Sequence, residues 1–121
     1  MATETVGLFK RKLTMDTMKL FAVIRTCGDA WNPSLRLEEQ PDWGAHASFM
    51  NRLEGEGFIV LGGPLEDAPD VLLIVRATTA NEIVERLRDD PWTSRDLLRI
   101  TRISQWTLRL GSLQGPNVGT A

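Results

Sequence analysis

Residues 58–78 read FIVLGGPLEDAPDVLLIVRAT, and this stretch decides the fold of the 121-residue chain. Two short apolar runs rich in β-branched residues, at 58–61 and 71–78, flank a segment in which Gly, Pro and Asp are frequent. This pattern is typical of two successive strands joined by a short connection. We expect Gly62-Gly63-Pro64 to end the first strand as a tight turn, and residues 65–69 to form a further turn.

A helix is predicted on each side of these two strands, over residues 41–54 and 79–89. Asp42 is the expected N-cap of the first helix. The second helix has Thr79 as its expected N-cap, with Glu82 three residues later as in a capping box. Its apolar stripe is expected to consist of Ile83, Val84 and Leu87.

Two outer strands complete the pattern, over residues 19–26 (KLFAVIRT) and 98–110. The apolar residues of the last strand change phase near Thr101-Arg102, which predicts a β-bulge there. Residues 28–40 form a loop of a length that is often functional. Asp90-Pro91 has the pattern of an N-cap followed by proline at the first position of a short helical turn.

The predicted order of elements is β-α-β-β-α-β, that of a ferredoxin-like α+β fold. Two right-handed crossovers then place both helices on one face of a four-stranded antiparallel sheet. The second face needs a cover as well, because the two central strands are continuously apolar rather than alternating. No other predicted element is large enough, so we expect a homodimer that packs sheet face against sheet face. We divide the chain into an N-terminal arm (1–17), the ferredoxin-like domain (18–111) and a flexible C-terminal tail (112–121).

The composition is that of an ordinary globular protein. A net charge of −2 and a pI of about 5.4 argue against nucleic-acid binding, which normally needs a basic face. No run approaches the ~18 apolar residues of a membrane helix, and residues 1–25 lack the pattern of a signal peptide. The single cysteine, Cys27, fits a reducing compartment. We therefore expect a cytoplasmic protein that binds neither nucleic acid nor membrane.

The chain has one histidine, His46, which lies on the apolar stripe of the predicted first helix. Trp43, His46, Met50 and Leu53 recur at helical spacing, so the imidazole points toward the core. Burying an ionisable group costs free energy unless the group has a partner or contact with solvent. His46 therefore needs an acidic partner, a solvent-reached cavity, or both. By itself, a lone histidine on an apolar face is more often structural than catalytic.

The order of several short motifs resembles that of the YCII-related family, small proteins of the dimeric α+β barrel superfamily. The resemblance covers residues 18–111. It rests on the histidine helix WGAHASFMNRLEGEG (43–57), Gly-Gly-Pro-Leu after the second strand, Asp-Pro-Trp at 90–92, and the late tryptophan of ISQWTLRLG (103–111). In that family the matching histidine and aspartate are regarded as a catalytic dyad, which implies this role for His46 and Asp90. Members discussed as enzymes are linked to lyase or dehydrohalogenase chemistry on small ring compounds.

A His46–Asp90 pair would have the chemistry of a general base. The carboxylate accepts from one ring nitrogen, fixes the tautomer and leaves the other nitrogen for a substrate. This suffices for proton abstraction beside a carbonyl, for isomerisation or for elimination. It does not suffice for acyl transfer, since the chain has no Gly-x-Ser-x-Gly motif. The candidates for substrate binding are Arg25, Trp31, Trp43, Phe49, Met50 and Trp92. For Phe49 and Met50 the hydrophobic core is the ordinary alternative, and for Arg25 it is a surface ion pair.

Three functions are compatible with these residues. Our first interpretation is a cofactor-free lyase or isomerase that transfers a proton on a small metabolite, cyclic or not. The alternative is a non-catalytic module of the same fold that binds a small molecule or an accessory partner. The third is a cofactor-independent oxygenase. No metal site is expected, because one His and one Cys cannot form a His-rich or Cys-rich zinc site.

Overall fold

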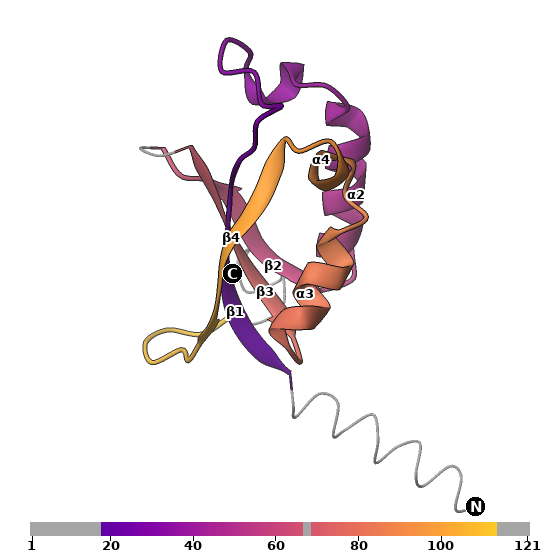
Figure 1. The fold of residues 1–121 in the computed structure, drawn as a ribbon. Coiled ribbons are helices and arrows are strands. Elements are labelled where there is room, and N and C mark those ends of the chain that lie inside the picture. Colours follow the sequence, from indigo (N-terminus) through magenta and orange to yellow (C-terminus); the bar gives the residue numbers. More distant parts are fainter. Residues whose placement is uncertain (1–17, 67–68, 114–121) are drawn as a thin grey trace, which may run out of the picture.

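The computed structural model describes residues 18–66 and 69–113, which form a four-stranded antiparallel sheet with helices on one face (Figure 1). The strands are β1 (Lys19–Cys27), β2 (Ile59–Pro64), β3 (Asp70–Ala77) and β4 (Leu98–Trp106). The helices are η1 (Leu37–Glu39), α2 (Trp43–Gly55), α3 (Ala80–Leu87) and α4 (Pro91–Ser94). The sheet order β2-β3-β1-β4, with every neighbouring pair antiparallel, confirms the ferredoxin-like prediction. The predicted arm over 1–17 lies outside the described residues, as does most of the predicted tail.

The Gly62-Gly63-Pro64 segment belongs to β2, so the prediction that it forms a tight turn is wrong. It pairs in register with Leu73, Leu72 and Val71 of β3. β2 is an edge strand, and an edge tolerates proline because its missing N–H can fall on the unpaired side. At Gly62 the strand has little room for a side chain, since an added Cβ would lie 2.7 Å from Leu73 Cδ2.

The last strand carries the predicted bulge but is shorter than predicted. Ile24 of β1 pairs with Arg102, whereas the next residue, Arg25, pairs with Ile100, so Thr101 is the extra residue of the bulge. The ladder ends at Trp106 rather than at residue 110. The reason is the partner strand: Trp106 lies opposite Leu20, and β1 begins only one residue before Leu20.

Both long helices lie where predicted, although two details of their ends and faces are wrong. Asp42 precedes α2 in the left-handed conformation, with φ of 60°, and its side chain makes no capping hydrogen bond. Its carboxylate instead accepts from the Arg95 guanidinium at 2.7 Å. Thr79 caps α3 as predicted, with Oγ1 accepting from the Glu82 N–H at 3.1 Å. Val84 does not join the apolar stripe of α3: it is exposed, whereas Ile83 and Leu87, four residues apart, are the buried residues of the helix.

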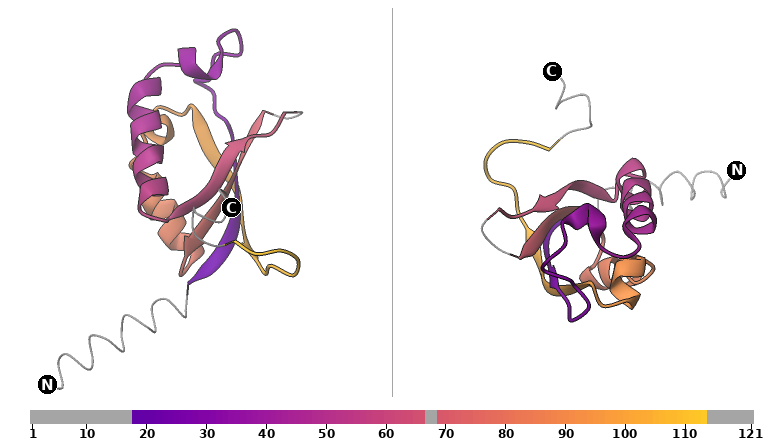
Figure 2. Two further views of the ribbon diagram at one scale, coloured as in Figure 1. Left: turned by 180° about the vertical axis from the view of Figure 1, so that it is seen from behind. Right: turned by 90° about the horizontal axis from the view of Figure 1, so that it is seen from above.

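The main core lies between the sheet and the helices α2 and α3, which cover the same face in both views of Figure 2. Alternate residues of β1, Phe21 and Val23, point into this core. Phe49 of α2 is buried there and Met50 packs against it. Within residues 18–66 and 69–113, no helix combines the length and apolar character needed to cross a lipid bilayer.

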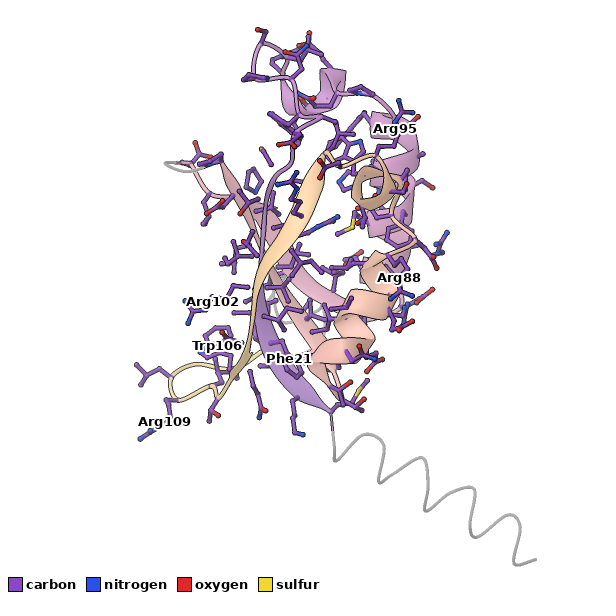
Figure 3. The ribbon with its side chains drawn as sticks, viewed as in Figure 1. Phe21, Arg88, Arg95, Arg102, Trp106 and Arg109 are labelled. Carbon is purple, nitrogen blue, oxygen red and sulfur yellow. The ribbon has the colours of Figure 1, made fainter. Side chains whose placement is uncertain are left out.

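The opposite face of the sheet is apolar at its centre, as the continuous apolar runs predicted. We call this surface the outer sheet face, and the strand register places on it Leu20, Ala22, Ile24, Leu61, Leu72, Ile74 and Trp106. Figure 3 shows Trp106 and Arg102 projecting from the side of the sheet away from the helices. Leu61 and Trp106 are 54% and 41% exposed. The described chain therefore leaves one apolar face of its sheet uncovered by its own helices.

Candidate active site

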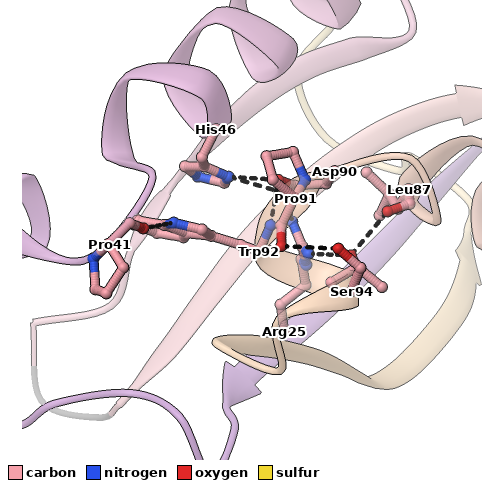
Figure 4. A network of polar contacts seen from close by, with 9 residues as sticks. Arg25, Pro41, His46, Leu87, Asp90, Pro91, Trp92 and Ser94 are labelled. Atoms are coloured by element: carbon pink, nitrogen blue, oxygen red, sulfur yellow. Dashed lines mark hydrogen bonds and ion pairs between the residues drawn. The ribbon is translucent and has the colours of Figure 1, made fainter.

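The structure brings His46 of α2 against Asp90, which precedes α4 and lies 44 residues further along the chain (Figure 4). The imidazole Nδ1 lies 2.9 Å from each oxygen of the Asp90 carboxylate. Asp90 is fully buried and His46 is 8% exposed. Because an ionised carboxylate only accepts hydrogen bonds, Nδ1 carries the hydrogen that is donated to it. Nε2 has no hydrogen-bond partner among the described residues.

Asp90 also caps the short helix that carries its neighbours. Its Oδ1 accepts from the Trp92 N–H at 3.0 Å, and Pro91 occupies the first helical position. This confirms the predicted N-cap and proline pattern. The capping role and the contact with His46 use the same carboxylate, so the orientation of α4 and that of the imidazole are fixed together.

Arg25 approaches the carboxylate from the other side. It lies on β1 in step with Phe21 and Val23, so its side chain faces the helices and is 1% exposed. The guanidinium donates to Asp90 Oδ2 at 2.8 Å and to Thr93 Oγ1 at 2.8 Å. The expected surface ion pair is therefore wrong: the pair is internal. Both terminal nitrogens of Arg25 are engaged within the protein, and binding of a substrate carboxylate by this residue stays a prediction.

The pKa of Asp90 reflects this surrounding. Burial by itself raises the pKa of the Asp90 carboxyl. The hydrogen bonds from His46, from the Trp92 N–H and from Arg25, together with the Arg25 charge, outweigh that effect. The pKa of Asp90 therefore lies below its ordinary value, and the group is a carboxylate at neutral pH.

Three of the four tryptophans form one cluster, and two of them lie next to the imidazole. The indole of Trp92 is stacked on the ring of His46, with centroids 3.8 Å apart, and its Nε1 donates to the Pro41 carbonyl at 2.6 Å. Trp31 meets the Trp92 ring edge-on at 5.6 Å, and Trp43 lies 5.8 Å from it. These rings form a second hydrophobic cluster, separate from the main core that holds Phe49. The structure thus places Trp43 and Trp92 next to His46 and Trp31 next to Trp92, and it places Phe49 elsewhere.

Two residues of this region were not identified from the sequence. Thr93 holds Arg25, and its hydroxyl donates to the Leu87 carbonyl at 2.8 Å. Gln40, which is 3% exposed, accepts from the Asn32 N–H and donates to the carbonyls of Asn32 and Leu35. These bonds fasten the 28–40 loop, which carries Trp31. In the sequence, Thr93 lies three residues after an N-cap, which is a weak indication that its side chain has a structural role. No local pattern sets Gln40 apart from the other polar residues of the loop.

A cavity lies away from the His46–Asp90 pair. It has a volume of about 250 Å³ and lies at the start of β1, the end opposite Arg25. Its lining consists of Met18, Glu56, Gly57, Phe58, Arg76, Glu82 and Arg86, none of them a predicted site residue. A pocket beside His46 and Asp90 stays a prediction. Among residues 18–66 and 69–113, no three His, Cys, Asp or Glu side chains are grouped so that they could hold a metal ion.

Comparison with known proteins finds similarity of fold among solved structures. No protein-family model matches the chain, and no curated protein matches it. One similar structure is 5-chloro-2-hydroxyhydroquinone dehydrochlorinase from Burkholderia phenoliruptrix AC1100, in complex with 2,5-dihydroxybenzoquinone. The TM-score is 0.52 at 22% sequence identity, over 76% of this chain and 95% of the other. This likeness shows the ferredoxin-like α+β fold.

Proposed function

We propose that this protein is a cofactor-free lyase or isomerase in which His46 transfers a proton on a small ring compound. The observation that carries the proposal is the buried pair itself: Nδ1 is held by the Asp90 carboxylate, while Nε2 lacks a partner among the described residues. A histidine fixed in this way is oriented to accept a proton at Nε2. Kinship with the YCII-related proteins is part of the same proposal.

The reaction begins when Nε2 of His46 removes a proton from a carbon beside a carbonyl or from a ring hydroxyl. The electron pair of the broken bond moves into the ring system. In an elimination, the carbon that carries a leaving group such as halide is tetrahedral, as in a keto tautomer of the ring. The electron pair forms a new π bond to that carbon, the halide departs with its bonding pair, and the imidazolium releases its proton to solvent. In an isomerisation, the imidazolium returns the proton to a different carbon. Asp90 stabilises the imidazolium in both cases and does not itself take the proton.

Ring compounds that carry oxygen substituents are the substrate class that we favour. Trp31 and Trp43 are only half-buried and lie beside the stacked His46–Trp92 pair, so flat rings would find aromatic partners there. The protein of similar fold is named for a chlorinated hydroxyhydroquinone and was solved with a dihydroxybenzoquinone. These names support the choice of compounds to test first.

The test is a turnover assay on chlorinated and unchlorinated hydroxyhydroquinones and on small cyclic ketones, followed by halide release and mass spectrometry. We expect wild-type protein to convert at least one of them and His46→Ala to lose about 100-fold or more of the rate. Asp90→Asn should also lose rate, whereas Asp42→Asn, which removes a surface carboxylate, should not. Equal turnover by folded His46→Ala would refute the mechanism. Saturable binding without turnover would instead favour the non-catalytic module.

We also propose that two copies of the chain associate through the outer sheet face. Its centre is apolar and none of the described helices lies on it, while Arg76 and Arg102 share the face at its edges, as in an interface with an apolar centre and a polar rim. Burial of such a face by a second sheet is the usual way in which two antiparallel sheets pack. The single cysteine, Cys27, supports the cytoplasm as the location of this dimer.

A further inference from the structure

Three ionisable side chains meet in the buried site, but only two of them carry a fixed charge. Asp90 is negative and Arg25 is positive, and both are almost completely shielded from solvent. His46 shares the same carboxylate. The cluster is therefore electrically neutral when the imidazole is neutral, and it carries a net positive charge when the imidazole is protonated.

The geometry ties Arg25 firmly to the oxygen that it shares with His46. Asp90 Oδ2 lies 2.8 Å from Nη1 of Arg25 and 2.9 Å from Nδ1 of His46. The other terminal nitrogen, Nη2, donates to Thr93 Oγ1, which is itself fixed on the Leu87 carbonyl. The guanidinium is thus held at two points, by the Asp90 carboxylate and by the Thr93 hydroxyl.

The presence of Arg25 changes what Asp90 does to the imidazole. A buried carboxylate alone favours a positive charge on a neighbouring histidine. A carboxylate already paired with an arginine stabilises a charged imidazole much less, because the positive guanidinium repels the positive imidazolium in a medium of low dielectric constant. Of the other charged side chains nearby, Asp42 precedes α2 and Arg95 follows α4, and these two pair with each other at the surface. The rings of Trp43 and Trp92 that contact His46 carry no formal charge.

We propose that Arg25 is a positioning residue that keeps His46 in its neutral form, with the hydrogen on Nδ1 and a free lone pair on Nε2 at neutral pH. A general base must be unprotonated before it acts, so Arg25 would maintain the competent form. The catalytic meaning of this role rests on the proposed function. The protonation state itself is measurable without any substrate.

The experiment is long-range 1H–15N NMR of the full chain with 15N-labelled histidine at pH 7, where one histidine gives one set of ring signals. Wild-type protein should show a neutral ring protonated at Nδ1. Arg25→Gln should raise the ratio of charged to neutral ring by about tenfold or more. Arg95→Gln, which removes a surface arginine, should leave the ring as in the wild type. A ratio of charged to neutral ring that is the same in folded Arg25→Gln protein as in the wild type overturns the proposal.

Two further variants keep the proposal testable if Arg25→Gln does not fold. Arg25→Lys keeps the charge, so its imidazole should remain neutral; a charged ring there contradicts the proposal. The double variant Arg25→Gln/Asp90→Asn removes both fixed charges, and its ring should be neutral again. A further outcome is that the imidazole is neutral in Arg25→Lys and in the double variant, as predicted, while wild-type protein turns over none of the test compounds. That result would refute the proposed function but not the role of Arg25.

Discussion

The indole of Trp92 lies flat on the imidazole of His46, with ring centroids 3.8 Å apart and planes 6° from parallel. Asp90, two residues earlier, binds the edge of the same imidazole at Nδ1. The four-residue helix α4 and its cap therefore contact one face and one edge of the ring. Another molecule can approach His46 only at the rest of the ring, which includes the edge that carries Nε2.

Replacing Trp92 by phenylalanine should destabilise the protein by roughly 1–3 kcal/mol. The variant loses the hydrogen bond from Nε1 to the Pro41 carbonyl and leaves part of a fully buried volume unfilled. Urea denaturation measures the free energy of unfolding. Trp31→Phe is the matched control and should cost less, because Trp31 is only half-buried. Equal losses for the two variants would contradict a special role for the stacked indole.

The stability that Asp90 contributes should depend on pH in the acid range. Its pKa is lower in the folded protein than the ordinary value of about 3.9 in an unfolded chain. The ionised group therefore stabilises the fold above that ordinary value, and the contribution is lost as the pH falls through the lower, folded value. We expect the difference in unfolding free energy between wild type and Asp90→Asn to be largest near neutral pH and to shrink below about pH 4.

Asp42→Asn is the control for this titration. Its carboxylate is paired with Arg95 at the surface, where such a pair contributes about 0–1 kcal/mol. The difference from wild type should therefore be small at every pH. If the difference in unfolding free energy between wild type and Asp90→Asn is constant from pH 7 down to pH 2, the pKa of Asp90 is the same in the folded and the unfolded protein, which contradicts the prediction.

Replacing Gln40 by alanine should loosen the 28–40 loop and cost about 1–3 kcal/mol. The buried amide makes three hydrogen bonds to the loop backbone, at 3.1, 2.7 and 3.1 Å. Hydrogen exchange should become faster at the Asn32 amide, which loses its acceptor. Gln105→Ala removes an exposed side chain of the same type on β4 and should leave this exchange unchanged. Unaltered protection in Gln40→Ala would show that other contacts fasten the loop.

Light scattering at micromolar concentration should give the mass of a dimer. Leu72→Lys places a charge on the outer sheet face and should shift the protein to the monomer. Val84→Lys makes the same kind of change on the exposed side of α3 and should leave the dimer intact. A wild-type monomer under these conditions refutes the dimer, whatever the variants do.

Local sequence patterns predicted the elements well but not their limits. Alternation, capping residues and helical spacing are properties of neighbouring residues, so β1, α3 and the bulge at Thr101 were found from them. Where β4 ends depends on where its partner β1 begins, which no pattern within 98–110 contains. The Gly62-Gly63-Pro64 segment has the local chemistry of a turn, and only its place on an edge strand allows it to remain extended.

Only part of the site was predicted, again because local sequence patterns do not contain contacts between residues far apart in the chain. Pairing of His46 with Asp90 followed from a family resemblance, because no local rule connects residues 44 positions apart. The inward direction of Arg25 was available from its alternation with Phe21 and Val23, but its partner lies 65 residues away. Gln40 makes its contacts only once the loop is closed. Burial and long-range partners are consequences of the tertiary fold, and a single sequence does not state them.

The most direct test of the central claim is to add 2,5-dihydroxybenzoquinone to protein with 15N-labelled His46 and to follow both ring nitrogens. We predict a saturable change in the Nε2 signal, while Nδ1 remains protonated and bound to Asp90. An Nε2 signal that does not move at saturating compound, or a change confined to Nδ1, would contradict the assignment of Nε2 as the nitrogen that meets the substrate.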